Sequence, residues 1–90
     1  MEQIRADESG TTYQADGFRV YYRVAGSKSG DNDVNVREHV YLLQGRMKVT
    51  VGDDKQEYEA PMMFEVPAKT YHVFESQSDT CFLVLHPDEE

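Results

Sequence analysis

Few side chains in this chain of 90 residues are suited to chemistry near neutral pH. The sequence holds three histidines and a single cysteine. Histidine acts as a general acid, a general base or a metal ligand, so His39, His72 and His86 are the first candidates. Cys81 lies in the apolar run CFLVL, where a buried, inert thiol is expected rather than a nucleophile. Whether these groups meet depends on the elements that carry them.

The first of these elements is a strand with two different faces. Residues 18–24 alternate in character, with Phe18, Val20, Tyr22 and Val24 on one face and Arg19, Tyr21 and Arg23 on the other. This period of two is typical of a half-buried strand. The next residues, 26–33, contain glycine, serine and aspartate without an apolar side chain. We expect them to form a mobile loop.

Further strands follow at short and even spacing, in the segments VREHVYLL, RMKVTV, QEYEA, MMFEVP, YHVFES and TCFLVLH. Gly45 and Gly52 are expected to supply the positive φ of hairpin turns between neighbouring antiparallel strands. No amphipathic window has the caps of a helix. The sequence therefore predicts one all-β domain over 1–90, an antiparallel sandwich or barrel, with flexible ends at 1–12 and 87–90.

The charge balance disfavours several classes of partner. Nine Lys and Arg residues stand against 17 Asp and Glu residues, which gives a formal net charge of −8. An acidic surface repels phosphate groups, so we expect neither nucleic acid nor an anionic membrane as a partner. No segment approaches the roughly 20 apolar residues of a membrane span, and the first residues lack a secretory pattern. We expect a soluble, cytoplasmic protein.

The spacing within residues 38–72 resembles the two motifs of the cupin superfamily. Six residues separate Glu38 from Gly45, as in the second half of the first cupin motif. The Pro, Gly and His places of the second motif are taken by Pro67, Lys69 and His72. The resemblance covers residues 18–86. It implies an antiparallel double-stranded β-helix, the jelly-roll barrel, which is often dimeric and holds a divalent metal near the mouth of a small cavity.

The metal shell that this resemblance implies is incomplete here. The first motif normally places two histidines, one residue apart, three or four residues before its glutamate. Those places hold Asn32 and Val34 or, on the longer spacing, Asp31 and Asp33. Glu38 and His72 alone remain of the usual ligands, so we predict that no metal is tightly bound. If a divalent transition metal does bind, the candidate ligands are Glu38, His72, Asp31, Asp33 and His39.

Separate expectations follow for His39, Lys69 and His86. If Glu38 faces the barrel interior, strand alternation turns His39 to the opposite surface, unless a bulge reverses it. Lys69 stands where the motif has glycine, and a positive φ there costs about 1 kcal/mol or more, so we expect a re-formed turn rather than a strained one. His86 is expected to be a surface residue that closes the last strand.

Three functions remain open. The favoured one is a cupin that binds a small polar ligand in its cavity without a tightly bound metal. The candidate ligand-binding residues are Glu38, His72, Tyr41, Tyr71 and Lys69. The alternatives are a metal-dependent enzyme of dioxygenase or isomerase type with a reduced ligand set, and a structural dimerisation module.

The last strand favours assembly. Cys81, Leu83 and Leu85 lie on one side of the segment CFLVL, and Phe82 and Val84 lie on the other. One of these faces fills the interior. The second needs a cover, because a monomer rarely tolerates a contiguous exposed apolar patch. We therefore expect a homodimer.

Overall fold

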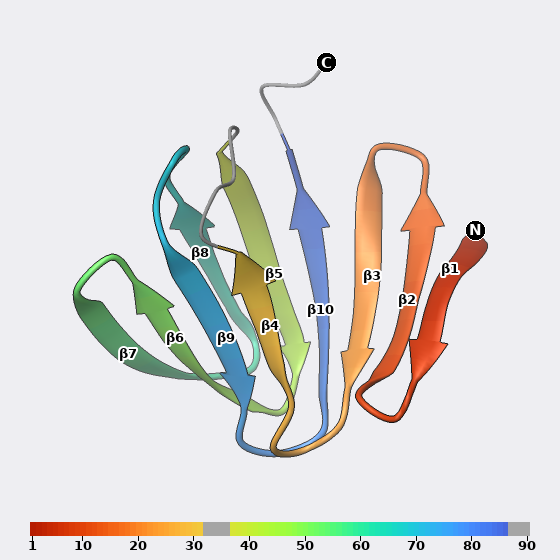
Figure 1. Ribbon diagram of the computed structural model, residues 1–90, viewed down its shortest axis with the longest axis horizontal. Helices are drawn as coiled ribbons and strands as arrows, with labels where there is room; N and C mark the ends of the chain where they lie inside the picture. The colour runs from red at the N-terminus through yellow and green to blue at the C-terminus, as the bar shows by residue number, and fades with distance from the viewer. Residues whose placement is uncertain (32–36, 87–90) are drawn as a thin grey trace.

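The computed structural model describes residues 1–31 and 37–86, which form ten strands in two antiparallel sheets (Figure 1). The larger sheet has the order β1 (Glu2–Asp7), β2 (Gly10–Ala15), β3 (Phe18–Arg23), β10 (Thr80–Leu85), β5 (Glu38–Gln44) and β8 (Met62–Val66). The smaller sheet has the order β4 (Lys28–Asp31), β9 (His72–Ser76), β6 (Arg46–Val51) and β7 (Asp54–Glu59). The described residues contain no helix, and the predicted fold class is confirmed.

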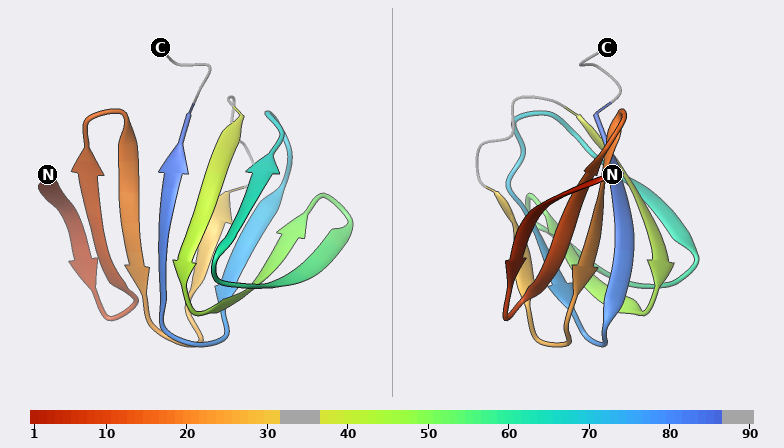
Figure 2. Two further views of the ribbon diagram at one scale, coloured as in Figure 1. Left: turned by 180° about the vertical axis from the view of Figure 1, so that it is seen from behind. Right: turned by 90° about the vertical axis from the view of Figure 1, so that its right-hand side faces the viewer.

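The chain passes repeatedly between the two sheets. β3 leads into β4, β5 into β6, β7 into β8, and β9 into β10, and each of these steps joins one sheet to the other. Figure 2 shows the β3–β4 and β9–β10 connections side by side at one end of the two layers. Gly26 N donates to Ser76 O there, at 2.7 Å. This alternation between sheets is the jelly-roll topology.

The apolar core lies where both layers overlap. Strand alternation turns one face of each strand inward, and the buried side chains are Val40, Leu42, Met47, Val49, Phe64, Val66, Phe74, Phe82 and Val84. The ring of Phe74 meets Phe64 and Phe82 edge to face, at centroid distances of 5.5 and 5.8 Å. Each fully buried side chain of this kind contributes roughly 1.5–3 kcal/mol.

The two predicted glycine turns have different outcomes. Gly52 has φ of +59° and joins the paired strands β6 and β7, as predicted. The prediction is wrong at Gly45, because β5 and β6 belong to different sheets and do not pair. Gly45 has φ of +89°, and a Cβ there would lie 2.2 Å from the carbonyl oxygen of Asp79. Both its conformation and this close approach require glycine at the crossing.

Strands lie within two segments that were expected to be a flexible end and a mobile loop. Residues 2–15 make the hairpin β1–β2, and β2 pairs with β3 along its full length. Residues 28–31 form β4, which pairs with β9. β4 carries no apolar side chain and is held by its backbone, so the hydrophobic pattern does not reveal it. The other parts of these expectations, residues 32, 33 and 87–90, lie outside the described residues.

β3 alternates as predicted, but its arginine face turns inward. Tyr21 stacks on Phe82 with a centroid distance of 4.9 Å, and Arg23 is only 3 % exposed. Tyr22 and Val24, on the more apolar face, are 47 % and 44 % exposed. β3 lies near the side where β1 and β2 extend past β4, the edge strand of the smaller sheet (Figure 1). There the space between the layers is a cavity rather than a core.

Candidate functional site

A cavity of about 430 Å³ lies between the two sheets. Its floor is made by Phe74, Phe82 and Val84, so it is continuous with the apolar core. The remaining lining is mostly polar and comes from strands of both sheets. Its volume falls within the roughly 300–1,000 Å³ of typical small-ligand sites.

One end of the cavity holds a carboxylate between two imidazoles. Glu38 begins β5 and is 9 % exposed, and His72 begins β9 and is 2 % exposed. Nε2 of His86 lies 2.9 Å from Oε2 of Glu38 and Nε2 of His72 lies 3.6 Å from Oε1. Because an ionised carboxylate only accepts hydrogen bonds, His86 donates from Nε2. Each oxygen of Glu38 therefore faces a different histidine.

The orientation of His72 decides whether a hydrogen bond joins it to Glu38. Its Nδ1 lies 3.1 Å from the carbonyl oxygen of Thr70, so Nδ1 carries a proton and donates it. In the neutral imidazole Nε2 is then an acceptor, and it faces the acceptor Oε1 of Glu38. Two facing acceptors are satisfied by a shared proton or by a donor that enters between them. A ligand hydroxyl supplies such a donor.

A basic wall stands across the cavity from this group. Arg19 and Arg23 come from β3, Arg5 from β1 and Lys28 from β4. These are four of the nine Lys and Arg residues in the chain, and Glu38 is the single acidic residue among the described residues that line the cavity. In a chain with a net charge of −8, the cavity is therefore a concentrated positive region.

Arg23 is the most deeply buried member of this wall. Its Nε donates to Ser29 Oγ at 3.2 Å and its Nη2 to Thr12 Oγ1 at 2.7 Å. Nη1 donates to two backbone carbonyls, those of Thr11 and Tyr22. Burial lowers the pKa of Arg23 from its usual value, with the nearby charge of Arg5 adding to this effect. A guanidinium nevertheless stays charged at neutral pH.

The structure brings two of the five predicted ligand-binding residues to the cavity, Glu38 and His72. Tyr41 lies on the outer face of the larger sheet, where it pairs in register with Met63, because it alternates with the inward residues Val40 and Leu42. His39 also faces outward, with its Nε2 3.4 Å from Glu65 Oε2.

Lys69 and Tyr71 lie on the exposed connection between β8 and β9. The expectation that the turn is re-formed is wrong, because Lys69 has φ of +57°, the left-handed conformation that glycine would adopt freely. The turn is tied at its far end, where Gly52 N donates to the carbonyl oxygen of Tyr71 at 2.7 Å. The left-handed residue is therefore retained, and lysine bears its cost.

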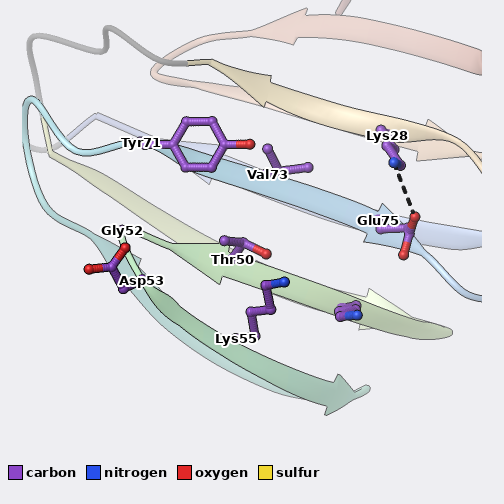
Figure 3. A pocket seen from close by; sticks show the side chains of 9 residues that line it. Lys28, Thr50, Gly52, Asp53, Lys55, Tyr71, Val73 and Glu75 are labelled. Carbon is purple, nitrogen blue, oxygen red and sulfur yellow. Dashed lines mark ion pairs between the residues drawn. The ribbon is translucent and has the colours of Figure 1, made fainter.

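Tyr71 lines a different hollow, on the outer face of the smaller sheet (Figure 3). Lys28 and Glu75 form an ion pair of 3.7 Å at the edge of this hollow. Every side chain that lines it is partly or fully exposed. It therefore lacks the buried polar groups that distinguish the cavity between the sheets.

His86 and the basic wall were missed by sequence reasoning. His86 is half-buried and contacts Glu38, so the expectation of a surface residue is wrong. It follows β10 directly, one residue beyond the pair formed by Leu85 and His39, which places it level with Glu38. The signal for the wall was present in the alternation of β3, with an arginine two residues on either side of Tyr21.

The donor groups of the described residues do not fit the metal shell that the family resemblance implies. Within residues 1–31 and 37–86, no group of three or more His, Cys, Asp or Glu side chains is placed to hold a metal ion. Glu38, His72 and His86 come nearest, but Oε2 of Glu38 is already bonded to His86. The backbone of Asp31 pairs with His72, and Asp33 lies outside the described residues.

The two sheets and the cavity between them define a jelly-roll protein with a site at the open side of the sandwich. A family model, described as cupin domain, matches residues 25–86, and the chain belongs to the cupin family. A search of curated proteins finds no match. No helix of the described residues is long and apolar enough to cross a membrane.

Several solved structures share the fold. KdgF from Halomonas sp. has a TM-score of 0.78 at 13 % identity, with 94 % of this chain and 84 % of that chain covered. A conserved protein of unknown function from Streptococcus pyogenes has a TM-score of 0.76 at 15 % identity, with 89 % and 75 % covered. A cupin superfamily protein from Desulfitobacterium hafniense has a TM-score of 0.71 at 18 % identity, with 82 % and 70 % covered. At these identities the likeness shows the fold alone.

Proposed function

We propose that this cupin domain binds a small polar ligand in the cavity between its sheets, without a tightly bound metal. The observation that carries the proposal is the contact of Nε2 of His72 with Oε1 of Glu38, 3.6 Å apart, at one end of a cavity of about 430 Å³. Buried polar groups are normally satisfied by a partner, and this pair takes a shared proton or a hydrogen-bond donor between its two atoms. A ligand hydroxyl that enters from the cavity supplies such a donor.

Ligand-dependent thermal stabilisation tests the proposal. A panel of small hydroxylated compounds, both neutral and acidic, is screened against the purified chain, and a binder raises the melting temperature by mass action. In Glu38→Gln the carboxylate becomes an amide, and we expect the affinity for the binder to fall about tenfold or more. Glu59→Gln, the same change at an exposed site on β7, serves as the control. Equal affinities in the two variants would contradict the proposal.

The metal-dependent enzyme is the alternative from a different class. A metal-dependent dioxygenase or isomerase needs a metal that stays bound, and Glu38 and His72 would provide two ligands. Elemental analysis of untagged protein separates the two functions. We expect far less than one equivalent of any transition metal. One equivalent that is lost in His72→Ala would favour the enzyme.

We propose further that the chain assembles as a homodimer through the outer face of its larger sheet. Five large side chains on this face are more than a third exposed: Tyr22, Val24, Tyr41, Leu43 and Met63. We call them the outer apolar face. A second copy presents the same face about a two-fold axis, which makes it a self-complementary cover. Sedimentation at high micromolar concentration tests this, with a dimer as the expected species and a monomer as the contrary result.

The proposed location is the cytoplasm. Cys81 is a free, buried thiol, and the described residues contain no disulfide. A free thiol of this kind is usual in a reducing compartment.

A further inference from the structure

We infer that the ligand is a small hydroxylated organic acid, whose carboxylate binds against Arg19 and Arg23 on the inner face of β3. This inference rests on the proposed function and deepens it, because it names the chemical class that the cavity selects. Its support comes from four features of the described residues: the distribution of charge, the burial of Arg23, the orientation of Arg19 and the length of the cavity.

Two of the four cations in the cavity wall are already paired. Nε of Arg5 lies 2.7 Å from Oδ2 of Asp7, and Nζ of Lys28 lies 3.7 Å from Oε2 of Glu75. Arg19 and Arg23 have no carboxylate partner within the part of the chain that the structure describes. The excess positive charge of the cavity is therefore concentrated on β3.

Arg23 is a buried cation whose hydrogen-bond partners are all neutral. It is 3 % exposed, and every oxygen that accepts from it belongs to a hydroxyl or a backbone carbonyl. Its guanidinium carbon lies 5.0 Å from the centroid of the Tyr21 ring, which offsets part of the charge. Buried charges are normally paired. An anion in the cavity supplies the missing counter-charge.

Arg19 is positioned to make the direct contact. Its Nε donates to Oε1 of Gln14 at 2.8 Å. Gln14 is itself held by two bonds from its Nε2, to the carbonyl oxygens of Ala15 and Phe18. The terminal nitrogens of Arg19 have no partner among the described residues. A guanidinium that is oriented at Nε and open at its tips matches the two oxygens of a carboxylate.

Strand register gives a scale for the separation between Arg23 and the contact of Glu38 with His72. Ser29, which accepts from Arg23, lies two residues before Asp31, the backbone partner of His72. Two residues of strand span about 7 Å. A ligand whose carboxylate reaches β3 and whose hydroxyl reaches the gap between Glu38 and His72 therefore carries these groups several bonds apart. Hydroxy acids and sugar acids have this form.

Calorimetric titration with matched pairs of compounds tests the inference. Gluconate is compared with sorbitol and glucuronate with glucose, so that within each pair the anionic group is the main difference. We expect the acid of at least one pair to bind about tenfold or more tightly than its neutral partner. Arg19→Gln is expected to weaken binding of that acid about 10- to 100-fold and to remove the preference. Arg46→Gln removes one positive charge at an exposed position outside the cavity and should leave both affinities unchanged.

The possible results separate the inference from the proposed function. If neutral compounds bind as well as acids, or Arg19→Gln keeps the preference, the carboxylate assignment is overturned while ligand binding stands. If inorganic phosphate competes as strongly as the acids, the site selects anions in general and the assignment also fails. If no compound of either series binds, the proposed function fails together with the inference. Far-UV circular dichroism of Arg19→Gln, an exposed position, checks that the fold is kept.

Discussion

The inner and outer faces of the larger sheet distribute charge and apolar surface in opposite ways near β3. On the inner face Arg23 is buried beneath Tyr21, whereas on the outer face Tyr22 and Val24 are about half exposed. Along β5 and β8 the inner face is conventional and carries Val40, Phe64 and other core residues. The strand face that lines a cavity therefore cannot be identified from hydrophobicity alone. On β3 the inner face buries a charged side chain, and the outer face exposes apolar ones.

The largest expected effect distinguishes the two faces by their packing. Phe82 on the inner face is 1 % exposed, and Phe82→Ala should lower the free energy of unfolding by about 3–5 kcal/mol, since it empties the centre of the core. Leu43 on the outer face is 52 % exposed. Leu43→Ala should lower the free energy of unfolding by about 0.5 kcal/mol or less in the monomer. Urea denaturation at low protein concentration measures the loss in each variant. Similar losses in the two variants would contradict the difference in packing between the faces.

A smaller effect is expected on association. Met63 lies in the outer apolar face and is 54 % exposed. A charge placed there must be desolvated when two copies meet, so Met63→Glu should weaken the proposed dimer by about 2–4 kcal/mol. Sedimentation velocity across a concentration series measures the change. Gln56→Glu adds the same charge on β7, away from this face, and should leave association unaltered. Equal dissociation constants for the two variants would exclude the outer apolar face as the interface.

The smallest effect concerns a thiol on the outer side of β10. Burial raises the pKa of Cys81, with a hydrogen bond to Tyr22 opposing the shift. The folded pKa therefore exceeds the unfolded one, so this contribution to stability is complete below about pH 8.5 and is lost as the pH rises through the folded pKa. Wild-type protein should lose stability in that alkaline range more steeply than Cys81→Ala. Denaturation curves at several pH values compare the slopes, and identical slopes would argue that the thiol is not buried.

Much of the fold could be predicted because alternation and turn residues act locally. The strands from residue 38 onward and the turn at Gly52 follow from period-two patterns and from residues that adopt positive φ. Gly45 shows the limit of this reasoning. A left-handed glycine reverses the chain or redirects it, and only the partners of β5 and β6 distinguish a hairpin from a crossing between sheets.

The candidate site could be predicted only in part. Motif spacing located Glu38 and His72, whose contact the structure shows. His86 could not be located in this way, because its contact with Glu38 depends on the register of β10 against β5. Arg19 and Arg23 were visible as one face of a strand. Their inward orientation depends on the other sheet ending at β4, which is a long-range property of the fold.

The position of the basic wall along the chain has a consequence for how this domain can change. The match to the cupin model begins at residue 25, whereas Arg5, Arg19 and Arg23 all precede it. Glu38 and His72 thus lie within the matched segment, and three of the four cations that line the cavity lie before it. Substitution of Arg5 or Arg19, both exposed, would therefore change the charge of the cavity without a change in the matched segment or in the core.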